Sequence, residues 1–207
     1  MDNIEQGTDE WRNLRLGKFT GSRFADVLAK SKRDGKPLKA RDDLIWTIVT
    51  ERIQGYQEQG LNSYSMQFGT DAEPFAREAY ELKTGEFVEE IAFIKHPVFD
   101  YVGVSPDGLI GTEGGIEIKC PKSPQIHLQR FIDGVPAEYM PQIQGCMWVT
   151  NSEWWDFVSY DPNTLEKFKM LIIRVYRDDK FIENLENEVK EAELEALELI
   201  KTLMLKA

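Results

Sequence analysis

The sequence predicts a mixed α/β (α+β) fold in which a central mixed sheet is flanked by helices. Two kinds of pattern lead to this prediction. Segments near both ends and in the middle carry apolar residues at helical spacing, whereas short β-branched or aromatic runs punctuated by Gly, Asp and Pro fill 87–120 and 154–176. The resulting order is helices, strands, helices, two strands and a helix, and it is typical of a sheet with helices on its faces.

Two short helices are expected first. The segment 8–17 has Thr8 in the position of an N-cap, and 22–29 has either Thr20 or Ser22 there. Hydroxyl side chains at that position accept hydrogen bonds from the otherwise unpaired first amides of a helix.

A loop and two longer helices follow. The loop, 30–41, contains Gly and Pro and is strongly basic. Apolar residues at helical spacing predict a helix over 41–54 and a second helical region over 65–83. Because proline lacks an amide hydrogen, Pro74 marks either the start of this second helix or a kink within a longer one.

The pattern then changes to short strands. The segments 87–95, 101–105, 108–111 and 116–120 are expected to form consecutive strands of a meander.

The last part of the chain alternates again. Helices are expected at about 124–133 and 138–149, strands at 154–161 and 169–176, and a long helix at about 179–205. The apolar residues expected near one face of that last helix are Leu185, Val189, Leu194, Leu197, Ile200 and Met204. The whole chain, 1–207, is expected to be a single domain with this acidic helix at its end.

Composition excludes several classes of protein. No run of 18 apolar residues is present, so no membrane span is expected, and the polar start is unlike a secretory signal. Cys120 and Cys146 form no CxxC pair, and there are only two histidines. A disulfide scaffold, a zinc site and an iron–sulfur cluster are therefore not expected, and a reducing cytoplasm is the simpler location.

The net charge of −11 is unevenly distributed. The segment 183–198 holds seven glutamates and one lysine, whereas 30–41 holds six bases and one acid. Each run is compatible with a simple solvated face. The segregation also allows an acidic outer helix to coexist with a basic inner face.

The stretch VSPDGLIGTEGGIEIKCP at 104–121 contains the residues that are expected to form an active site. Alternate residues of a strand face the same side, so Glu117 and Lys119 would face a cleft while Ile116, Ile118 and Cys120 enter the core. A hairpin through 111–115 would bring Asp107 beside Glu117.

Two neighbouring carboxylates repel each other unless a cation lies between them. Oxygen ligands without thiolate or imidazole favour Mg²⁺, with Mn²⁺ as the alternative, and the carbonyl of Ile118 would add an oxygen. Lys119 would hold and acidify a water or stabilise charge on a phosphate. Either Asp-Gly or Glu-x-Lys alone is commonplace, so the combination on a predicted strand gives the prediction its weight.

The motif formed by Pro106, Asp107, Glu117 and Lys119 resembles the signature of the PD-(D/E)xK nuclease superfamily. More specifically, ordered blocks from about residue 5 to residue 180 resemble phage lambda-type exonucleases, the YqaJ-like viral recombinase family. The blocks are WRNLRLGKFTGSRFADVLA, FGTDAEPFAREAY, SPDG, EIKCP, YMPQIQGCMWVT and FVSYDP.

The resemblance implies a restriction-endonuclease-like core and a 5′→3′ exonuclease. Such an enzyme degrades one strand of linear double-stranded DNA to 5′ mononucleotides and leaves a 3′ overhang. The family further implies two Mg²⁺ ions per site, a ring-shaped homotrimer, a single-strand annealing protein as partner, and a phage or prophage gene expressed in the bacterial cytoplasm. In such a ring, the bases of 30–41 would line the channel.

The resemblance also assigns roles residue by residue. Asp107, Glu117 and the Ile118 carbonyl would bind metal, and Lys119 would be the catalytic lysine. Glu73 would approach the metals through water, and Gln142 would orient the nucleophile. The remaining matched positions are Arg15, Ser22 and Ser105 for the terminal 5′-phosphate and Met66 for a strand-separating wedge.

Plainer interpretations stand beside these roles. Glu73 and Arg77 suit an ion pair on one helix face, Ser22 a helix cap, and Met66 core filling. Gln142 and Arg15 suit simple surface positions. Trp154 and Trp155 are expected to pack the sheet or a subunit interface, and Lys122 and His127 are candidates for further phosphate contacts.

Two alternative functions remain open from the sequence. One is an endonuclease of the same superfamily, for which a terminal-phosphate pocket would have no use. The other is a non-catalytic protein that binds DNA ends, for which the complete set of Asp107, Glu117 and Lys119 would have no use.

Overall fold

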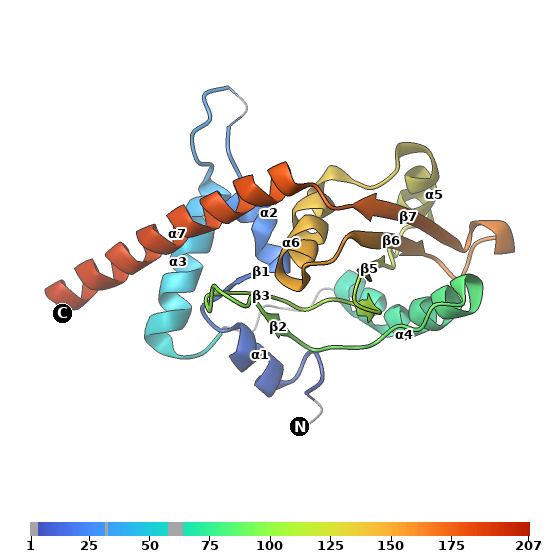
Figure 1. Ribbon diagram of the computed structural model, residues 1–207, viewed down its shortest axis with the longest axis horizontal. Helices are drawn as coiled ribbons and strands as arrows, with labels where there is room; N and C mark the ends of the chain where they lie inside the picture. The colour runs from blue at the N-terminus through green and yellow to red at the C-terminus, as the bar shows by residue number, and fades with distance from the viewer. Residues whose placement is uncertain (1–3, 32, 58–63) are drawn as a thin grey trace.

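A computed structural model describes residues 4–31, 33–57 and 64–207, with side chains in the last range described from residue 68. Within these ranges, seven strands form two sheets, which lie side by side in the ribbon (Figure 1). The larger sheet has the order β4 (Gly108–Ile110), β5 (Gly114–Lys119), β6 (Trp154–Tyr160) and β7 (Met170–Tyr176). The smaller sheet has the order β1 (Phe19–Thr20), β3 (Val102–Val104) and β2 (Ile94–Lys95).

The larger sheet is mixed, as predicted. β4 and β5 form an antiparallel hairpin, β6 and β7 are antiparallel, and β5 and β6 are parallel. A parallel pair requires a long crossover, and the chain supplies it with α5 (Pro124–Asp133), η2 (Ala137–Tyr139) and α6 (Met140–Thr150).

The remaining helices lie before, between and after the strands in the chain. They are α1 (Asp9–Arg15), η1 (Gly21–Arg23), α2 (Phe24–Val27), α3 (Lys39–Gln54), α4 (Tyr64–Thr84), η3 (Glu166–Phe168) and α7 (Asp179–Lys206). α4 runs through Pro74, so the longer of the two predicted helices is the one observed. None of the described helices is both long enough and apolar enough to cross a membrane.

The predicted helix caps are half right. The Thr8 hydroxyl accepts a hydrogen bond from the Trp11 amide (3.3 Å) and caps α1. Neither Thr20 nor Ser22 caps the next helices, because η1 and α2 begin without a side-chain cap and both hydroxyls accept hydrogen bonds from Arg15 instead.

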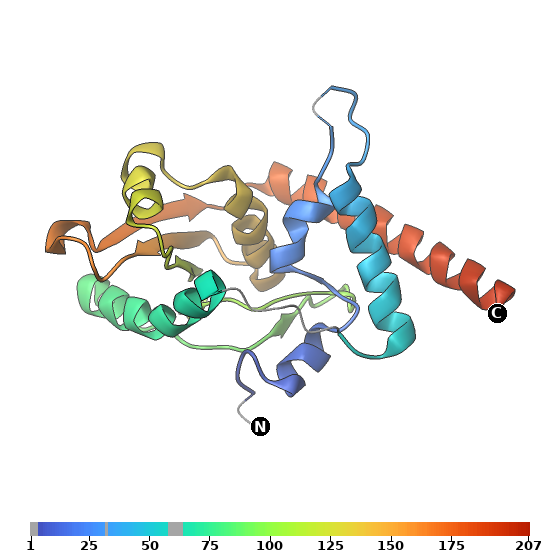
Figure 2. The same cartoon turned by 180° about the vertical axis from the view of Figure 1, so that it is seen from behind.

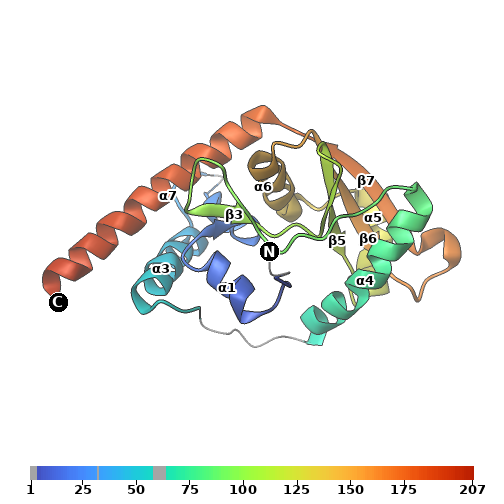
Figure 3. The ribbon, with the colours of Figure 1, turned by 60° about the horizontal axis from the view of Figure 1, so that its bottom comes forward.

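Helices cover both faces of the larger sheet. On one face, α4 packs Ala76 and Tyr80 against Ile116 and Val158. On the other face, α6 lies between the two sheets and joins them to α2, α3 and α7 in one apolar core (Figure 3). β5 is therefore buried on both sides, and its charged residues are held in a fixed environment.

The predicted meander is wrong in two respects. The segments 101–105 and 108–111 are consecutive in sequence, but β3 and β4 belong to different sheets. Of the predicted strand 87–95, only β2 at its end and one bridge from Glu89 to Leu109 are strand-like. This segment passes from the edge of one sheet to the edge of the other, so it has no continuous pairing partner.

α7 lies against α3, as seen from both sides of the molecule (Figures 1 and 2). The acidic face of α7 forms ion pairs with bases of the segment 30–41. Lys30 pairs with Glu188, and Arg41 makes two bonds to Glu195 (2.9 and 2.8 Å). Two bases of 30–41 thus pair with glutamates of α7 within the same chain, which contradicts the idea of separate acidic and basic faces.

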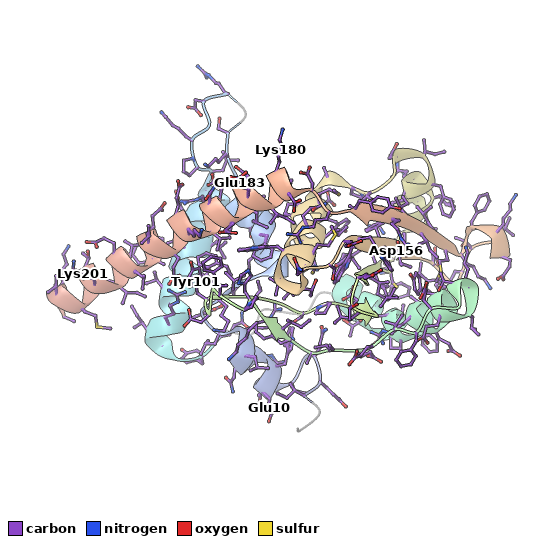
Figure 4. The ribbon with its side chains drawn as sticks, viewed as in Figure 1. Glu10, Tyr101, Asp156, Lys180, Glu183 and Lys201 are labelled. Carbon is purple, nitrogen blue, oxygen red and sulfur yellow. The ribbon has the colours of Figure 1, made fainter. Side chains whose placement is uncertain are left out.

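The apolar face of α7 also differs from the prediction. Leu185 and Val189 are fully buried, but Leu194 is 68% exposed. The buried stripe continues through the small residues Ala192 and Ala196, where α7 packs closely. Exposed charged side chains such as Lys180, Glu183 and Lys201 project from the opposite side (Figure 4).

Truncating two leucines of α7 should therefore have unequal effects on stability. Leu185→Ala is expected to lower the free energy of unfolding by about 2–5 kcal/mol, because it leaves a cavity in the core. Leu194→Ala, on the same helix, is expected to change it by less than about 0.5 kcal/mol. Urea denaturation monitored by circular dichroism compares the two variants, and equal losses would contradict the observed orientation of α7.

Candidate active site

The β4–β5 hairpin brings the two predicted carboxylates together. Gly108 pairs with Ile116, so Asp107 and Glu117 are the next facing positions. The Asp107 Oδ2 atom accepts a hydrogen bond from the Ile118 amide (2.6 Å). The prediction that Asp107 lies beside Glu117 is confirmed.

Glu117 and Lys119 form an ion pair on β5. The Glu117 side chain is completely buried, and its Oε2 atom has no hydrogen-bond partner among the described residues. Lys119 is 27% exposed and reaches a cleft, where its Nζ atom lies 5.2 Å from the centre of the Tyr139 ring. The apolar residues Ile116 and Ile118 enter the core, as the alternation of a strand predicts. Glu117 is buried as well, so of the two charged residues predicted to face the cleft only Lys119 does so.

The site concentrates negative charge in a dry environment. Burial raises the pKa of Glu117 to about 8. The charge of Lys119 opposes this rise, and the charge of Asp107 adds to it. Burial and the charge of Asp107 raise the pKa of Glu73 to about 7, and burial raises the pKa of Asp107. Burial opposes the charged form of Lys119, but Glu117 and Asp107 outweigh it and raise its pKa. These raised carboxylate pKa values are typical of buried acids that share one site.

The donor set fits a hard divalent cation. The unpartnered Oε2 atom of Glu117 is a buried acceptor without a donor, and Asp107 supplies a second carboxylate. No three His, Cys, Asp or Glu side chains within the described residues are close enough to enclose an ion. Two carboxylates with a backbone carbonyl and water molecules would suit Mg²⁺, which retains several waters.

Glu73 reaches the site from α4, where Arg77 holds it. The Arg77 guanidinium donates to Glu73 (2.9 Å) and to the backbone carbonyl of Asp107 (3.2 Å), and it pairs with Glu90 (2.8 Å). The predicted ion pair is confirmed, and it lies beside the acids instead of on a remote helix face. The link from Arg77 to the Asp107 backbone was not predicted, because it joins positions 30 residues apart.

Gln142 lies in the first turn of α6 and is half-buried. Its Cγ atom packs near Gly21 of η1, 3.5 Å from where a Cβ atom at that glycine would lie. One turn later, burial and the charges of Glu117 and Asp107 raise the pKa of Cys146, so α6 lies beside the acidic cluster.

The three residues predicted for a terminal phosphate are assembled around Arg15. Its guanidinium donates to Ser105 Oγ (3.0 Å) and Ser22 Oγ (3.2 Å) and stacks over the Trp11 ring at 4.4 Å. Trp11 Nε1 also donates to Ser105 Oγ (2.8 Å). The structure confirms that these side chains converge, although they come from α1, η1 and the loop after β3.

Arg15 is surrounded by hydroxyl groups instead of acids. Among the described residues, no carboxylate lies within ion-pair distance of it. Burial, with the neighbouring charge of Arg23, lowers the pKa of Arg15 to about 10. A partly buried guanidinium with hydroxyl neighbours is suited to bind an anion.

Two clefts open beside the acidic cluster formed by Glu73, Asp107 and Glu117, and Glu73 lines both clefts. The first, here called the main cleft, has a volume of about 780 Å³ and includes Lys119, Lys122 and Arg130. The second has a volume of about 720 Å³ and includes Trp11 and Asp107. The acids thus lie between two openings.

Other predicted contacts have mixed outcomes. His127 is completely buried and bonded to Ser159 Oγ (2.8 Å) and to the carbonyl of Phe168 (2.6 Å), so it is wrong as a phosphate contact. Lys122 lines the main cleft and stays a prediction. The side chain of Met66 lies outside the described residues, so its role as a wedge also stays a prediction.

The tryptophans pack the sheet, as predicted. Trp155 is completely buried, and Trp154 stacks with the Arg174 guanidinium at 3.5 Å. Arg174 in turn pairs with Asp156, which lies within the larger sheet (Figure 4). Sequence analysis gave no role to Tyr139, although it opens the block YMPQIQGCMWVT, or to Arg130, which lies in none of the blocks.

Comparisons with known proteins agree with this geometry. The YqaJ-like viral recombinase domain matches residues 10–153. The alkaline exonuclease LHK-Exo from Laribacter hongkongensis is 39% identical, with a TM-score of 0.88 over 96% of this chain and 97% of that chain. LHK-Exo in complex with dAMP matches equally well.

A phage related exonuclease from Haemophilus somnus 129PT shares the fold, with a TM-score of 0.72 at 16% identity over 90% of this chain and 96% of that chain. No curated protein matches. The extent of the domain match, together with the PD-(D/E)xK arrangement of Asp107, Glu117 and Lys119, shows that this chain belongs to the YqaJ-like viral recombinase domain family.

Proposed function

We propose that this protein, an exonuclease of the YqaJ-like family, uses Mg²⁺ to degrade one strand of linear double-stranded DNA in the 5′→3′ direction. The products would be 5′ mononucleotides and a 3′ overhang. One observation carries the proposal: the Arg15 guanidinium and its hydroxyl neighbours, here called the Arg15 pocket, lie next to the carboxylate and lysine set, and Ser105 and Asp107 join the two.

The spacing of the two sites favours release of single nucleotides. Ser105 and Asp107 are two residues apart, so their Cα atoms are separated by at most about 7 Å. A terminal phosphate at Ser105 and Arg15 would therefore place the next phosphodiester of the same strand beside Asp107. An endonuclease has no need of a pocket for a chain end, so this proximity favours the exonuclease.

Asp107, Glu117 and the Ile118 carbonyl would hold the metal. When bound, Mg²⁺ supplies Lewis-acid stabilisation of phosphate charge and lowers the pKa of a coordinated water. Glu73, held by Arg77, would bind such water molecules from the other side of the cluster.

Lys119 supplies a fixed positive charge at the scissile phosphate. Its pKa is raised, so it remains an ammonium group at neutral and alkaline pH. Glu117 and the Tyr139 ring hold it at the entrance of the main cleft. A preorganised cation in a partly dry site stabilises charge that develops in the transition state. Gln142 is proposed to orient the attacking water.

The assembly is proposed by analogy with the family. The protein would form a homotrimeric ring around DNA and hand its 3′ overhang to a single-strand annealing protein during recombination. A phage or prophage origin and action in the bacterial cytoplasm fit these roles. Because Lys30 and Arg41 pair with α7, other bases would have to line the channel.

A comparison of substrates tests the proposal. The protein should release acid-soluble nucleotides from linear 5′-phosphorylated duplex in Mg²⁺, but not in EDTA and not from covalently closed circular duplex. Cleavage of the closed circle would support the endonuclease alternative. A mobility shift without nucleotide release in Mg²⁺ would support the non-catalytic binding protein.

A further inference from the structure

Arg130 of α5 is a buried guanidinium without an acidic partner. Its side chain is 6% exposed, and no carboxylate in the described part of the chain lies within ion-pair distance. Among the described residues it donates only to two hydroxyl groups, those of Ser159 (2.9 Å) and, more weakly, Tyr139 (3.4 Å). The Nε atom has no hydrogen-bond partner within the part of the chain that the structure describes.

Arg41 is also a buried arginine, but it has an acidic partner. Arg41 is 2% exposed and makes two bonds to the carboxylate of Glu195. Arg130 instead lies 5.6 and 5.5 Å from the Tyr139 and Phe157 ring centres, and burial lowers its pKa. A buried charge without a counter-ion is costly, so an anion from outside the chain would be stabilising beside Arg130.

The main cleft is the opening from which such an anion would reach Arg130. Arg130, Lys122 and Ser123 line it on the side of α5, and we call these three residues the Arg130 subsite. α5 begins at this point with Ser123 as its N-cap, and the Ser123 side chain does not bond to the first-turn amides. The start of a helix adds a favourable field for an anion. Glu138 on the rim opposes it, but this residue is exposed and its charge is screened by solvent.

The strand register places the Arg130 subsite relative to the catalytic groups. Lys119 of β5 is paired with Ser159 of β6, and Ser159 is the residue to which Arg130 donates. Asp107 lies on the other side of β5, next to β4. The Arg130 subsite and the Arg15 pocket therefore approach Lys119 from opposite sides of β5.

We infer that the Arg130 subsite binds the phosphodiester that follows the scissile one on the strand being degraded. The phosphates would then occupy three consecutive positions: the 5′ end at Arg15, the scissile group at Lys119 and the next group at Arg130. This order rests on the proposed function, whereas binding of a phosphodiester by the subsite does not.

A double-mutant cycle on DNA binding tests this assignment without requiring cleavage. The ligands are two 5′-phosphorylated duplexes, one natural and one with a neutral methylphosphonate at the second linkage from the 5′ end. Affinity is measured in EDTA by fluorescence anisotropy. For the wild type, neutralising this linkage should weaken binding about tenfold, the usual size of a charge-assisted contact. Arg130→Gln should weaken binding of the natural duplex by about the same factor.

Binding of the Arg130→Gln variant to the modified duplex shows whether the two changes are coupled. If Arg130 contacts that phosphate, the variant with the modified duplex should bind about tenfold and not a hundredfold more weakly than the wild type with natural DNA. Arg130→Lys, which keeps the charge, should retain most of the wild-type sensitivity to the methylphosphonate and carries the test if the glutamine variant does not fold. Independent, multiplying losses would overturn the inference, as would coupling to a different linkage.

Two controls separate this result from other causes. A methylphosphonate in the middle of the duplex should show no coupling to Arg130, and Arg41→Gln should show no coupling to either modified linkage. Because the cycle measures binding, failure of the inference leaves nucleotide release in Mg²⁺ intact. Conversely, coupling in EDTA without any release in Mg²⁺ would retain the subsite and reject the exonuclease.

Discussion

Replacing Lys119 by alanine is expected to reduce nucleotide release from linear duplex by about 10²–10³-fold, the usual effect of removing one preorganised charge from a transition state. The structure gives the reason, because Lys119 is the ammonium group that faces the main cleft beside both carboxylates. Affinity for DNA in EDTA should fall by no more than the loss of one phosphate contact. Single-turnover release in Mg²⁺ and anisotropy in EDTA measure the two effects separately.

Folding must be checked in the same experiment, because the variant leaves the buried Glu117 carboxylate without its partner. Thermal unfolding monitored by circular dichroism will show whether Lys119→Ala is folded at the assay temperature. Lys201→Ala is the matched control, since this lysine is 70% exposed near the end of α7 (Figure 4). Full activity of a folded Lys119→Ala variant would remove its assigned role.

Replacing Arg15 by alanine is expected to lower the rate on 5′-phosphorylated ends by about 10–100-fold, the range for hydrogen bonds to a charged group. The rate on 5′-hydroxyl ends should change little, because those ends lack the charge that Arg15 binds. The variant should therefore lose its preference for phosphorylated ends. Initial rates on duplexes that differ only in the 5′ group measure that preference as a ratio.

Arg12→Ala is the matched control for Arg15. It lies on the same helix, but its guanidinium pairs with the exposed Asp9 (2.6 Å) and makes no described contact with Ser22 or Ser105. This control should keep the preference for phosphorylated ends. An equal loss of activity on both kinds of end for Arg15→Ala would show that the residue supports the fold instead of binding a phosphate.

The core of the site could be predicted because it depends on local rules. The alternation of a strand assigns Glu117 and Lys119 to one side of β5, and a short glycine-rich turn returns the chain beside Asp107. The residues around Arg15 came from a family resemblance. No local pattern would have joined Arg15 to Ser105, which lies 90 positions away.

Other features were missed because they depend on long-range pairing. The sheet divides between β3 and β4 although both segments have ordinary strand patterns, since each strand finds a different partner. The acidic α7 and the basic loop were treated as separate faces, but opposite charges brought them together at Lys30 and Arg41. Arg130 is conspicuous only once its burial and lack of a carboxylate are known.

The polarity of degradation tests the central claim most directly. A linear duplex with a 5′ phosphate on each strand is labelled on one strand only, either at the 5′-terminal or at the 3′-terminal nucleotide, and is digested in Mg²⁺. If the Arg15 pocket delivers the strand to Asp107, Glu117 and Lys119, the 5′ label should appear at once as a mononucleotide, and the 3′ label should remain in long DNA. Early release of the 3′ label, or a 5′ label released in longer fragments, would contradict the account.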